Sequence, residues 1–265
     1  MTRILIGIMV VFCCLFYAET SFSISLTGGV EVEEYLKQNK LNAIYDSDTG
    51  KAVTNAKVSI PLKGYSTRTD ENGYFKLDTE LNGTTILSVD ANGYKPYSLT
   101  IDKEATRKPL MLGIDKQSEL AIVIDSQIRH LGDDNYSANS ANSGDFRTSA
   151  SGPKFSKSFN LSSLKSGKRP YLKIGSVIGL DTQTAHRISQ SSTSSYSSPL
   201  KIYMNSKKIG EIRINGDNQS IPIPISSLNI GGSNTVAIAT GKNVQKTDYI
   251  DYDDMEFMNI LLEYR

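Results

Sequence analysis

Short runs of hydrophobic and β-branched residues, separated by Gly, Asn and Asp, follow one another along almost the whole chain. In many of them apolar and polar residues alternate, and a period of two is typical of β-strands that bury one face. No stretch has the spacing of a long amphipathic helix. The pattern therefore predicts an all-β protein. The predicted strands are 40–45, 56–62, 74–79, 84–91, 96–102, 119–125, 154–161, 169–179, 198–214 (a hairpin turning at 205–208), 219–225, 234–240 and 255–264.

Turn signals lie between the runs of the first half, at 47–52, 70–73, 81–83 and 91–94. Asn-Gly and Asp-x-x-Gly supply the tight-turn or positive-φ positions that hairpins need. Strands that recur about every 8–12 residues predict a small antiparallel β-sandwich. Before it, the sequence "VEVEEYLKQNKLNAIYD" is compatible with a short helical turn that leads into the first strand.

The segment 112–118 interrupts this pattern, and a new β run begins at Glu119. We therefore expect two β-sandwich domains, a small one over 40–113 and a larger one over 114–265. Residues 24–39 form an N-terminal extension. In the second half, about seven or eight strands without a long helix favour a jelly-roll sandwich.

The N-terminus reads as a targeting segment. One Arg precedes an apolar run from Ile4 to Ala18, which is short for a membrane span of about 20 residues, and small residues follow it. We expect residues 1–23 to be a secretory signal peptide, cleaved after Ala18, Thr20 or Ser23. The alternative is an uncleaved N-terminal anchor. Bulky residues before Cys13 and Cys14 disfavour a lipoprotein signal.

Composition excludes several classes of function. Of 265 residues, 38% are hydrophobic and 22% are charged, which is ordinary for a globular protein. The net charge is +1 and Lys and Arg do not cluster, so we expect no nucleic-acid partner. Both cysteines lie in the predicted signal, so the mature chain has no disulfide or thiolate chemistry. An exported protein without disulfides fits the bacterial periplasm, cell surface or exterior, and we expect no membrane span after cleavage.

The first half carries a family pattern. The sequence "DSDTGKAVTNAKVSI" is followed by "STRTDENGYFKL" and "ILSVDANGYKPYSLTI". Residues 40–113 resemble a carboxypeptidase regulatory-like domain of the transthyretin-like or collagen-adhesin B-type group. The resemblance implies a seven-stranded prealbumin-like sandwich that acts as a spacer or docking unit. Some adhesin relatives form Lys–Asn isopeptide bonds, but no residue stands out as a partner for Lys57.

The second half resembles a different family. "RHLGDDNYSANSANSGDF" follows its first strand, and "DDMEFMNILLEY" closes it. Residues 119–265 resemble the galactose-binding-like jelly rolls found as carbohydrate-binding modules, in which the "LGD" loop and the "DDxEF" start of the last strand recur. The resemblance implies carbohydrate binding. The chain has no Trp, so tyrosines would have to stack on the sugar.

Two long Ser-, Asn- and Gly-rich loops, 132–152 and 184–198, are either functional or disordered. Tyrosines in or near loops, with one arginine, are the candidates for ligand binding, although packing is the commoner role of tyrosine in a sandwich. The candidate ligand-binding residues are Tyr136, Arg187, Tyr196 and Tyr252.

The acidic residues of the second half suggest calcium, which takes six to eight oxygen ligands. In the last strand, alternation places Glu256 with Met258, Ile260, Leu262 and Tyr264 on the more apolar face, where a carboxylate is costly unless paired or metal-bound. The resemblance also implies a structural calcium between an early strand and the last one. Solvated turns and carboxylates bonded to backbone amides are the alternatives. The candidate ligands are Asp133, Asp134, Asp254 and Glu256.

Catalysis is the least favoured function. The chain has none of the short nucleophile, zinc or phosphate motifs. Because serine is abundant in this chain, a Ser–His–Asp combination around His130 or His186 would arise by chance and is weak evidence for catalysis. For His130 the favoured role is a structural one, donating to a backbone carbonyl, ahead of ligand contact or metal binding.

We therefore expect an exported, non-catalytic protein whose jelly roll binds carbohydrate or a cell-surface protein, with structural calcium as its cofactor. The alternative is a structural or interaction subunit of a cell-surface assembly with no sugar site.

Overall fold

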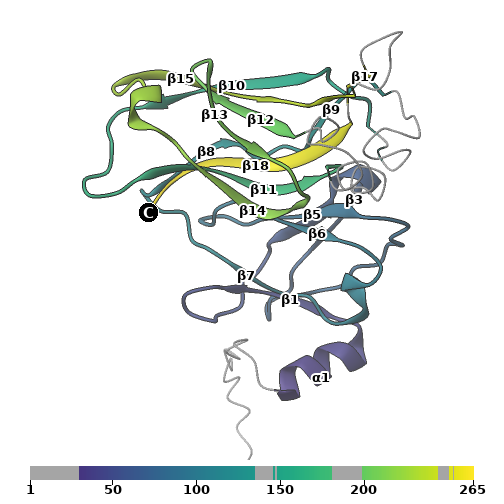
Figure 1. The fold of residues 1–265 in the computed structure, drawn as a ribbon. Coiled ribbons are helices and arrows are strands. Elements are labelled where there is room, and N and C mark those ends of the chain that lie inside the picture. The colour runs from purple at the N-terminus through teal and green to yellow at the C-terminus, as the bar shows by residue number, and fades with distance from the viewer. Residues whose placement is uncertain (1–29, 135–145, 147, 181–198, 244–250, 253) are drawn as a thin grey trace, which may run out of the picture.

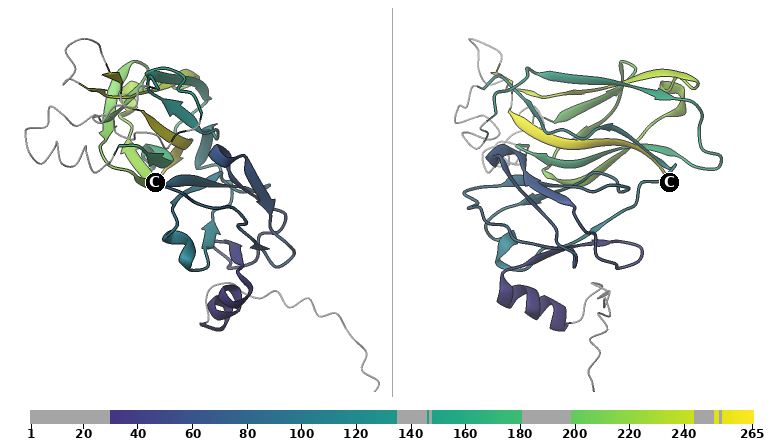
Figure 2. Two further views of the ribbon diagram at one scale, coloured as in Figure 1. Left: turned by 90° about the vertical axis from the view of Figure 1, so that its right-hand side faces the viewer. Right: turned by 180° about the vertical axis from the view of Figure 1, so that it is seen from behind.

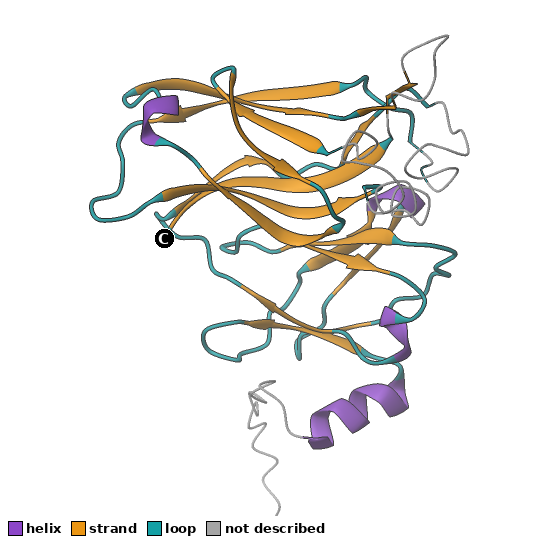
Figure 3. Ribbon diagram, in the orientation of Figure 1, coloured by secondary structure: helices purple, strands orange, loops and turns teal. Residues whose placement is uncertain are grey.

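The computed structural model describes residues 30–134, 146, 148–180, 199–243, 251–252 and 254–265. These residues form two β-sandwiches stacked on each other, so that four sheets lie in successive layers (Figure 1). Strands dominate and helical segments are short (Figure 3). The predicted all-β, sandwich-type fold is confirmed.

The N-terminal sandwich holds seven strands within residues 42–114, all of which are described. One sheet has the order β4-β1-β7 and the other β3-β2-β5-β6. Its core contains Ile44, Val58 and Leu87, each fully buried. The prediction of a purely antiparallel sandwich is wrong, because β1 pairs in parallel with β7. The bounds are β1 Asn42–Asp46, β2 Lys57–Ile60, β3 Tyr65–Arg68, β4 Tyr74–Phe75, β5 Thr85–Asp90, β6 Tyr97–Ile101 and β7 Met111–Ile114.

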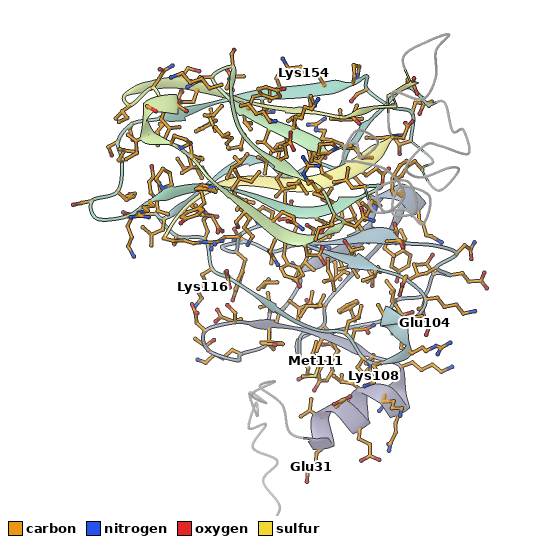
Figure 4. All side chains as sticks on the ribbon, viewed as in Figure 1. Glu31, Glu104, Lys108, Met111, Lys116 and Lys154 are labelled. Atoms are coloured by element: carbon orange, nitrogen blue, oxygen red, sulfur yellow. The ribbon has the colours of Figure 1, made fainter. Side chains whose placement is uncertain are left out.

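Helix α1 (Val30–Asn39) is longer than the short turn expected from the sequence. Acidic residues lie in its first turn and Lys37 in its last, which suits the helix dipole. Leu36 is fully buried in a small cluster with Ala43 and Tyr74, against which Met111 also packs (Figure 4). Burial of this one apolar stripe holds the helix on the sandwich. Three short 3₁₀ segments are η1 Pro61–Lys63, η2 Ala105–Arg107 and η3 Ile225–Ser227.

The C-terminal sandwich consists of a sheet of order β10-β15-β12-β13 and a sheet of order β14-β11-β18-β8, with β9 also paired to β18. The segments β9, β16 and β17 were not predicted, and each is two or three residues long. The bounds are β8 Ala121–Asp125, β9 Arg129–Leu131, β10 Lys154–Leu161, β11 Pro170–Ile178, β12 Leu200–Met204, β13 Lys207–Ile212, β14 Gly216–Pro222, β15 Gly232–Ala239, β16 Lys242–Asn243, β17 Asp251–Tyr252 and β18 Met255–Tyr264.

The hairpin between β12 and β13 turns at two residues, Asn205 and Ser206, rather than across 205–208. Both have positive φ, 48° and 66°, as the twist-matched two-residue hairpin turn requires.

Strand β18 changes face at Asn259, which has a φ of 62°. Phe257 before this residue and Ile260 after it both belong to the core of the C-terminal sandwich, whereas Met258 belongs to a separate cluster at the junction of the sandwiches. The prediction that Glu256 shares a face with Ile260, Leu262 and Tyr264 is therefore wrong. Glu256 lies in phase with Met258, and the positive φ of Asn259 hides this from simple alternation.

The two sandwiches meet through the outer faces of the sheet that holds β5 and β6 and the sheet that holds β11 and β18 (Figure 2). Ile86, Ile178 and Met258 form the apolar part of the contact. Gly175 allows the close approach, since a Cβ there would collide with the Ser98 hydroxyl.

The polar part centres on the Asp217 carboxylate of the C-terminal sandwich. Its Oδ1 accepts hydrogen bonds from Thr100 N (2.9 Å), Thr100 Oγ1 (2.9 Å) and Ser176 Oγ (2.6 Å). Beside it, Lys95 Nζ lies 3.3 Å from Glu263 Oε1. The junction is thus built from specific partners on both sides.

Within the described residues, no helix combines the length and the apolar character that a membrane crossing needs.

Candidate functional site

Three long connections leave the C-terminal sandwich at one end, which we call the loop end. Strand pairing shows this: Leu131 at the end of β9 pairs with Met255 at the start of β18, and Ile178 at the end of β11 pairs with Glu256. The start of β10 and the start of β12 both pair with the end of β15. The described strand ends that flank 132–153, 179–199 and 244–250 therefore lie close together, near the labels β9 and β17 in Figure 1.

His130 lies at the base of the loop end, in β9, and is 5% exposed. Its Nε2 is 2.8 Å from Asp254 Oδ1, and its Nδ1 is hydrogen-bonded to the carbonyl oxygen of Thr148. Phe146 packs against the ring, with 4.7 Å between centroids. The structure thus matches the favoured role for His130, a donor to a backbone carbonyl, and adds a carboxylate partner.

The environment of His130 favours its charged form. Burial lowers the pKa of this imidazole, but the bonds to Asp254 and Thr148 and the charge of Glu256 outweigh burial, so the pKa is raised. Both ring nitrogens face oxygen acceptors, which requires a hydrogen on each. The surroundings of His130 therefore favour an imidazolium beside the acidic residues.

The "LGD" motif has a steric reason. Gly132 has a φ of 149°, and a Cβ at this position would collide with the carboxylate of Asp254. Only glycine lets the chain after β9 pass this close to the start of β18. Two residues on, the backbone N of Asp134 lies 3.3 Å from Asp254 Oδ1. The carboxylate of Asp134 accepts from Ala150 N at 2.9 and 3.1 Å.

Glu256 is fully buried opposite His130, its pairing partner on β9. Neither of its carboxylate oxygens has a hydrogen-bond partner in the described part of the chain, and Asp254 Oδ2 has none there either. Burial raises the pKa of Glu256 to about 8, against the opposing effect of the His130 charge. A buried carboxyl without partners is costly unless it is protonated or bound to a cation.

The donor set decides which cation would fit. Ligand atoms of His130, Asp134 and Asp254 lie within 4.8 Å of one another. Both nitrogens of His130 are engaged, which disfavours a transition metal that prefers imidazole. The three unpartnered oxygens of Asp254 and Glu256 are hard ligands of the type that calcium takes, although calcium needs six to eight. Glu256 is not a member of the group whose ligand atoms converge, so the residues fit calcium in ligand type only, and further oxygens would have to complete the shell.

Of the predicted metal ligands, Asp134 and Asp254 are brought together, and Glu256 lies beside His130. Asp133 is exposed and is not a member of the three-residue group. Of the predicted ligand-binding residues, Tyr136, Arg187 and Tyr196 lie outside the described residues. Tyr252 lies in β17, where its backbone pairs with Lys242.

The N-terminal sandwich contains a buried carboxylate of a different kind. Asp46 begins the "DSDTG" turn, and its carboxylate accepts from the backbone N of Thr49 (2.8 Å) and from Tyr94 Oη (3.0 Å). Lys116 Nζ lies 3.2 Å away; this lysine is labelled in Figure 4. Burial acts to raise the pKa of Asp46, but bonds from Thr49, Lys116 and Tyr94 leave it well below the usual range.

Comparison with known families and structures supports the first half most directly. The family model of the CarboxypepD_reg-like domain matches residues 43–124. The carboxypeptidase regulatory-like resemblance is thereby confirmed for this part of the chain. No curated protein matches the sequence.

Among solved structures, the chain is similar to the CBM51-2 and INT domains of ZmpB from Clostridium perfringens. The identity is 13% and the TM-score is 0.22, and the match covers 84% of this chain and 46% of that chain. The match thus spans less than half of that protein chain, and likeness at this level carries no argument about function.

Proposed function

We propose that this is an exported, non-catalytic binding protein whose C-terminal sandwich recognises carbohydrate or a cell-surface partner at the loop end. The observation that carries the proposal is the convergence of three long connections on one end of a rigid sandwich. Binding residues are commonly placed on loops that a rigid scaffold positions. The sequence puts Tyr136, Arg187 and Tyr196 in two of these connections.

The buried cluster below the loop end supports this role. His130, Asp134 and Asp254 join the two ends of the connection 132–153 to the start of β18. A base of this kind limits the freedom of a binding loop before its ligand arrives, which lowers the entropic cost of binding.

A glycan array tests the proposal. We expect a signal that weakens when Tyr136 or Tyr196 is replaced by Ala, because each substitution removes a candidate stacking surface. Tyr35→Ala is the control, since Tyr35 is 51% exposed on α1, in the other sandwich. A silent array, or a signal that all three variants leave intact, would count against the loop end as a sugar site. Intact mass of the secreted protein checks the predicted cleavage after residue 23.

The alternative is an interaction subunit without a sugar site, and one feature favours it. Ile225 and Ile230 are 53% and 52% exposed at the end of the sandwich opposite the loop end. Exposed apolar residues of this kind can contribute to a protein contact. A silent glycan array together with self-association that is lost on Ile225→Ser and Ile230→Ser would support this alternative.

We further propose calcium as the cation of the buried cluster, with Asp254 and Glu256 supplying carboxylate ligands and Asp133 and Asp134 lying on the adjoining segment. A bound cation stabilises the folded state by mass action. EDTA should therefore lower the melting temperature, and added calcium, but not added sodium, should restore it. Identical melting curves in EDTA and in calcium would exclude a structural calcium.

A further inference from the structure

A polar groove of about 490 Å³ lies at the junction of the two sandwiches. Its volume is within the range of about 300–1,000 Å³ that small-molecule sites occupy. One wall comes from β2, β3 and β5 of the N-terminal sandwich, and the other from β8, the segment that follows it, and β18. Neither sandwich alone forms this groove.

The floor of the groove contains an amide without partners. Asn259 lines the groove and is 1% exposed, yet neither its Oδ1 nor its Nδ2 has a hydrogen-bond partner among the residues that the structure describes. A buried amide left unpaired costs about 1–3 kcal/mol. Such a group is retained where something else, a ligand or an ordered water, completes its hydrogen bonds.

The positive φ of Asn259 is what presents this amide. A regular strand would continue its alternation through Asn259, but the φ of 62° breaks it and leaves the side chain at the sandwich junction. Asparagine is among the few residues other than glycine that adopt this backbone region readily. Asn259 therefore combines a rare backbone conformation with a side chain that has no partner among the described residues, which is typical of functional positions.

The other lining residues define the chemistry of a ligand. Hydroxyl and amide side chains alternate in the lining with apolar residues such as Val123, Ile128 and Met258. Lys57 and Asp90 also line the groove and are pairing partners on β2 and β5, so their opposite charges lie side by side. The groove thus favours a neutral molecule that both donates and accepts hydrogen bonds. The polar uncharged lining residues are Ser59, Ser66, Ser88, Ser126, Gln127 and Asn259.

We propose that this junction groove binds an uncharged, hydroxyl-rich small molecule of the saccharide class, with the Asn259 amide as its central contact. An amide presents an acceptor oxygen and two N–H donors, which match neighbouring hydroxyls of a sugar ring. The site lies apart from the loop end and makes the N-terminal sandwich a part of ligand binding rather than a spacer.

Titration with glucose, galactose, N-acetylglucosamine, cellobiose and lactose, followed by calorimetry and saturation-transfer NMR, tests the site. We expect at least one of these sugars to bind the unmodified protein. Asn259→Gly keeps the positive φ and removes the amide, so binding should weaken about tenfold or more while the melting temperature stays close to that of the unmodified protein. If Asn259 were only structural, the melting temperature would fall and sugar affinity would not change.

A second variant does not depend on Asn259. Ser66→Trp places an indole at the exposed wall of the groove and should abolish binding by blocking it. Ser156→Trp, at an exposed strand position in β10, is the matched control and should bind normally. The proposal is wrong if no sugar of the panel binds, or if binding survives Ser66→Trp.

The loop-end and groove sites can fail independently. Binding that is lost on Ser66→Trp and kept on Tyr136→Ala and Tyr196→Ala assigns the sugar to the groove. The reverse pattern assigns it to the loop end and overturns the groove proposal.

Discussion

Each sandwich buries an acidic side chain, and the two are treated in opposite ways. In the N-terminal sandwich, Asp46 is surrounded by donors, and its pKa lies below the usual range. In the C-terminal sandwich, both carboxylate oxygens of Glu256 lack partners among the described residues, and burial raises its pKa to about 8. A buried carboxylate thus stabilises the N-terminal sandwich at Asp46 and lowers the stability of the C-terminal sandwich at Glu256.

The difference separates structural acids from candidate functional ones. Asp46 completes a turn, and its partners are the backbone of 48–49, Tyr94 in the N-terminal sandwich, and Lys116 just after β7. Asp217 is similar, because the two donors from Thr100 join it to the other sandwich and Ser176 of its own sandwich donates a third bond. Three carboxylate oxygens of Glu256 and Asp254 have no hydrogen-bond partner among the described residues. A fold keeps such groups, at a cost in stability, where they bind a cation or a proton.

The largest effect should come from removing the partnered carboxylate. Asp46→Ala abolishes several hydrogen bonds and an ion pair of a buried carboxylate together, so we expect the melting temperature to fall by roughly 10 °C or more. Calorimetry checks this. The control is Asp48→Ala, which removes an exposed carboxylate two residues away and should have almost no effect.

The pH dependence of Asp46 has a definite sign. Because its folded pKa lies below the unfolded value, its contribution to stability is present at neutral pH and is lost as the pH falls below about 4. The difference in unfolding free energy between the unmodified protein and Asp46→Ala should therefore shrink between pH 6 and pH 2. A constant difference would show that ionisation of Asp46 is irrelevant.

Removing the unpartnered carboxylate should have the opposite effect. The folded pKa of Glu256 is about 8 against a usual value of 4.5, so its carboxyl costs stability increasingly as the pH rises between these values. In EDTA at pH 7, Glu256→Gln should be more stable than the unmodified protein by on the order of 3 kcal/mol. If calcium binds Glu256, the unmodified protein should gain stability from added calcium and the variant should not.

Glu263→Gln is the matched control on the same strand. Glu263 is 3.3 Å from Lys95 Nζ and 3.7 Å from Lys173 Nζ, so its loss should destabilise the protein regardless of calcium. A Glu256→Gln variant less stable than the unmodified protein in EDTA would contradict the contrast between the two sandwiches.

The smallest effect is expected at the junction. Asp217→Asn keeps an acceptor oxygen and loses only the charge, so we expect a destabilisation of about 1 kcal/mol. Differential scanning calorimetry should show the melting transitions of the two sandwiches moving apart, because their coupling weakens. Asp78→Asn, at an exposed position of the N-terminal sandwich, should leave them unchanged. Unchanged transitions in Asp217→Asn would remove Asp217 from the coupling.

Local sequence pattern was a good guide to many of the strands. The predicted runs 154–161 and 255–264 coincide with β10 and β18. The phase of β18 could not be read, because all ten of its residues are buried and one residue with positive φ shifts the alternation. The parallel pairing of β1 with β7 was missed for a related reason, since strands that pair lie far apart in sequence.

The candidate site was predicted in parts. Asp134, Asp254 and Glu256 were selected for their oxygen chemistry, and the structure brings Asp134 to Asp254 and places Glu256 opposite His130. The contact between His130 and Asp254 was not predicted from the sequence. The glycine of "RHLGDD" is a sign of it, because Gly132 lets the chain pass close to the Asp254 carboxylate. The junction groove left no sequence signal, because its two walls come from different sandwiches.

The sequence by itself determined the kind of element at most positions: strands from alternation, turns from Asn-Gly and Asp-x-x-Gly, and a regulatory-like domain from its motif. Only the tertiary structure decided which carboxylates found donors and which did not. The reason is physical. Strand and turn preferences act over a few neighbouring residues, whereas the partners of a buried charge come from any distance, as in the contact of His130 with Asp254, 124 positions apart.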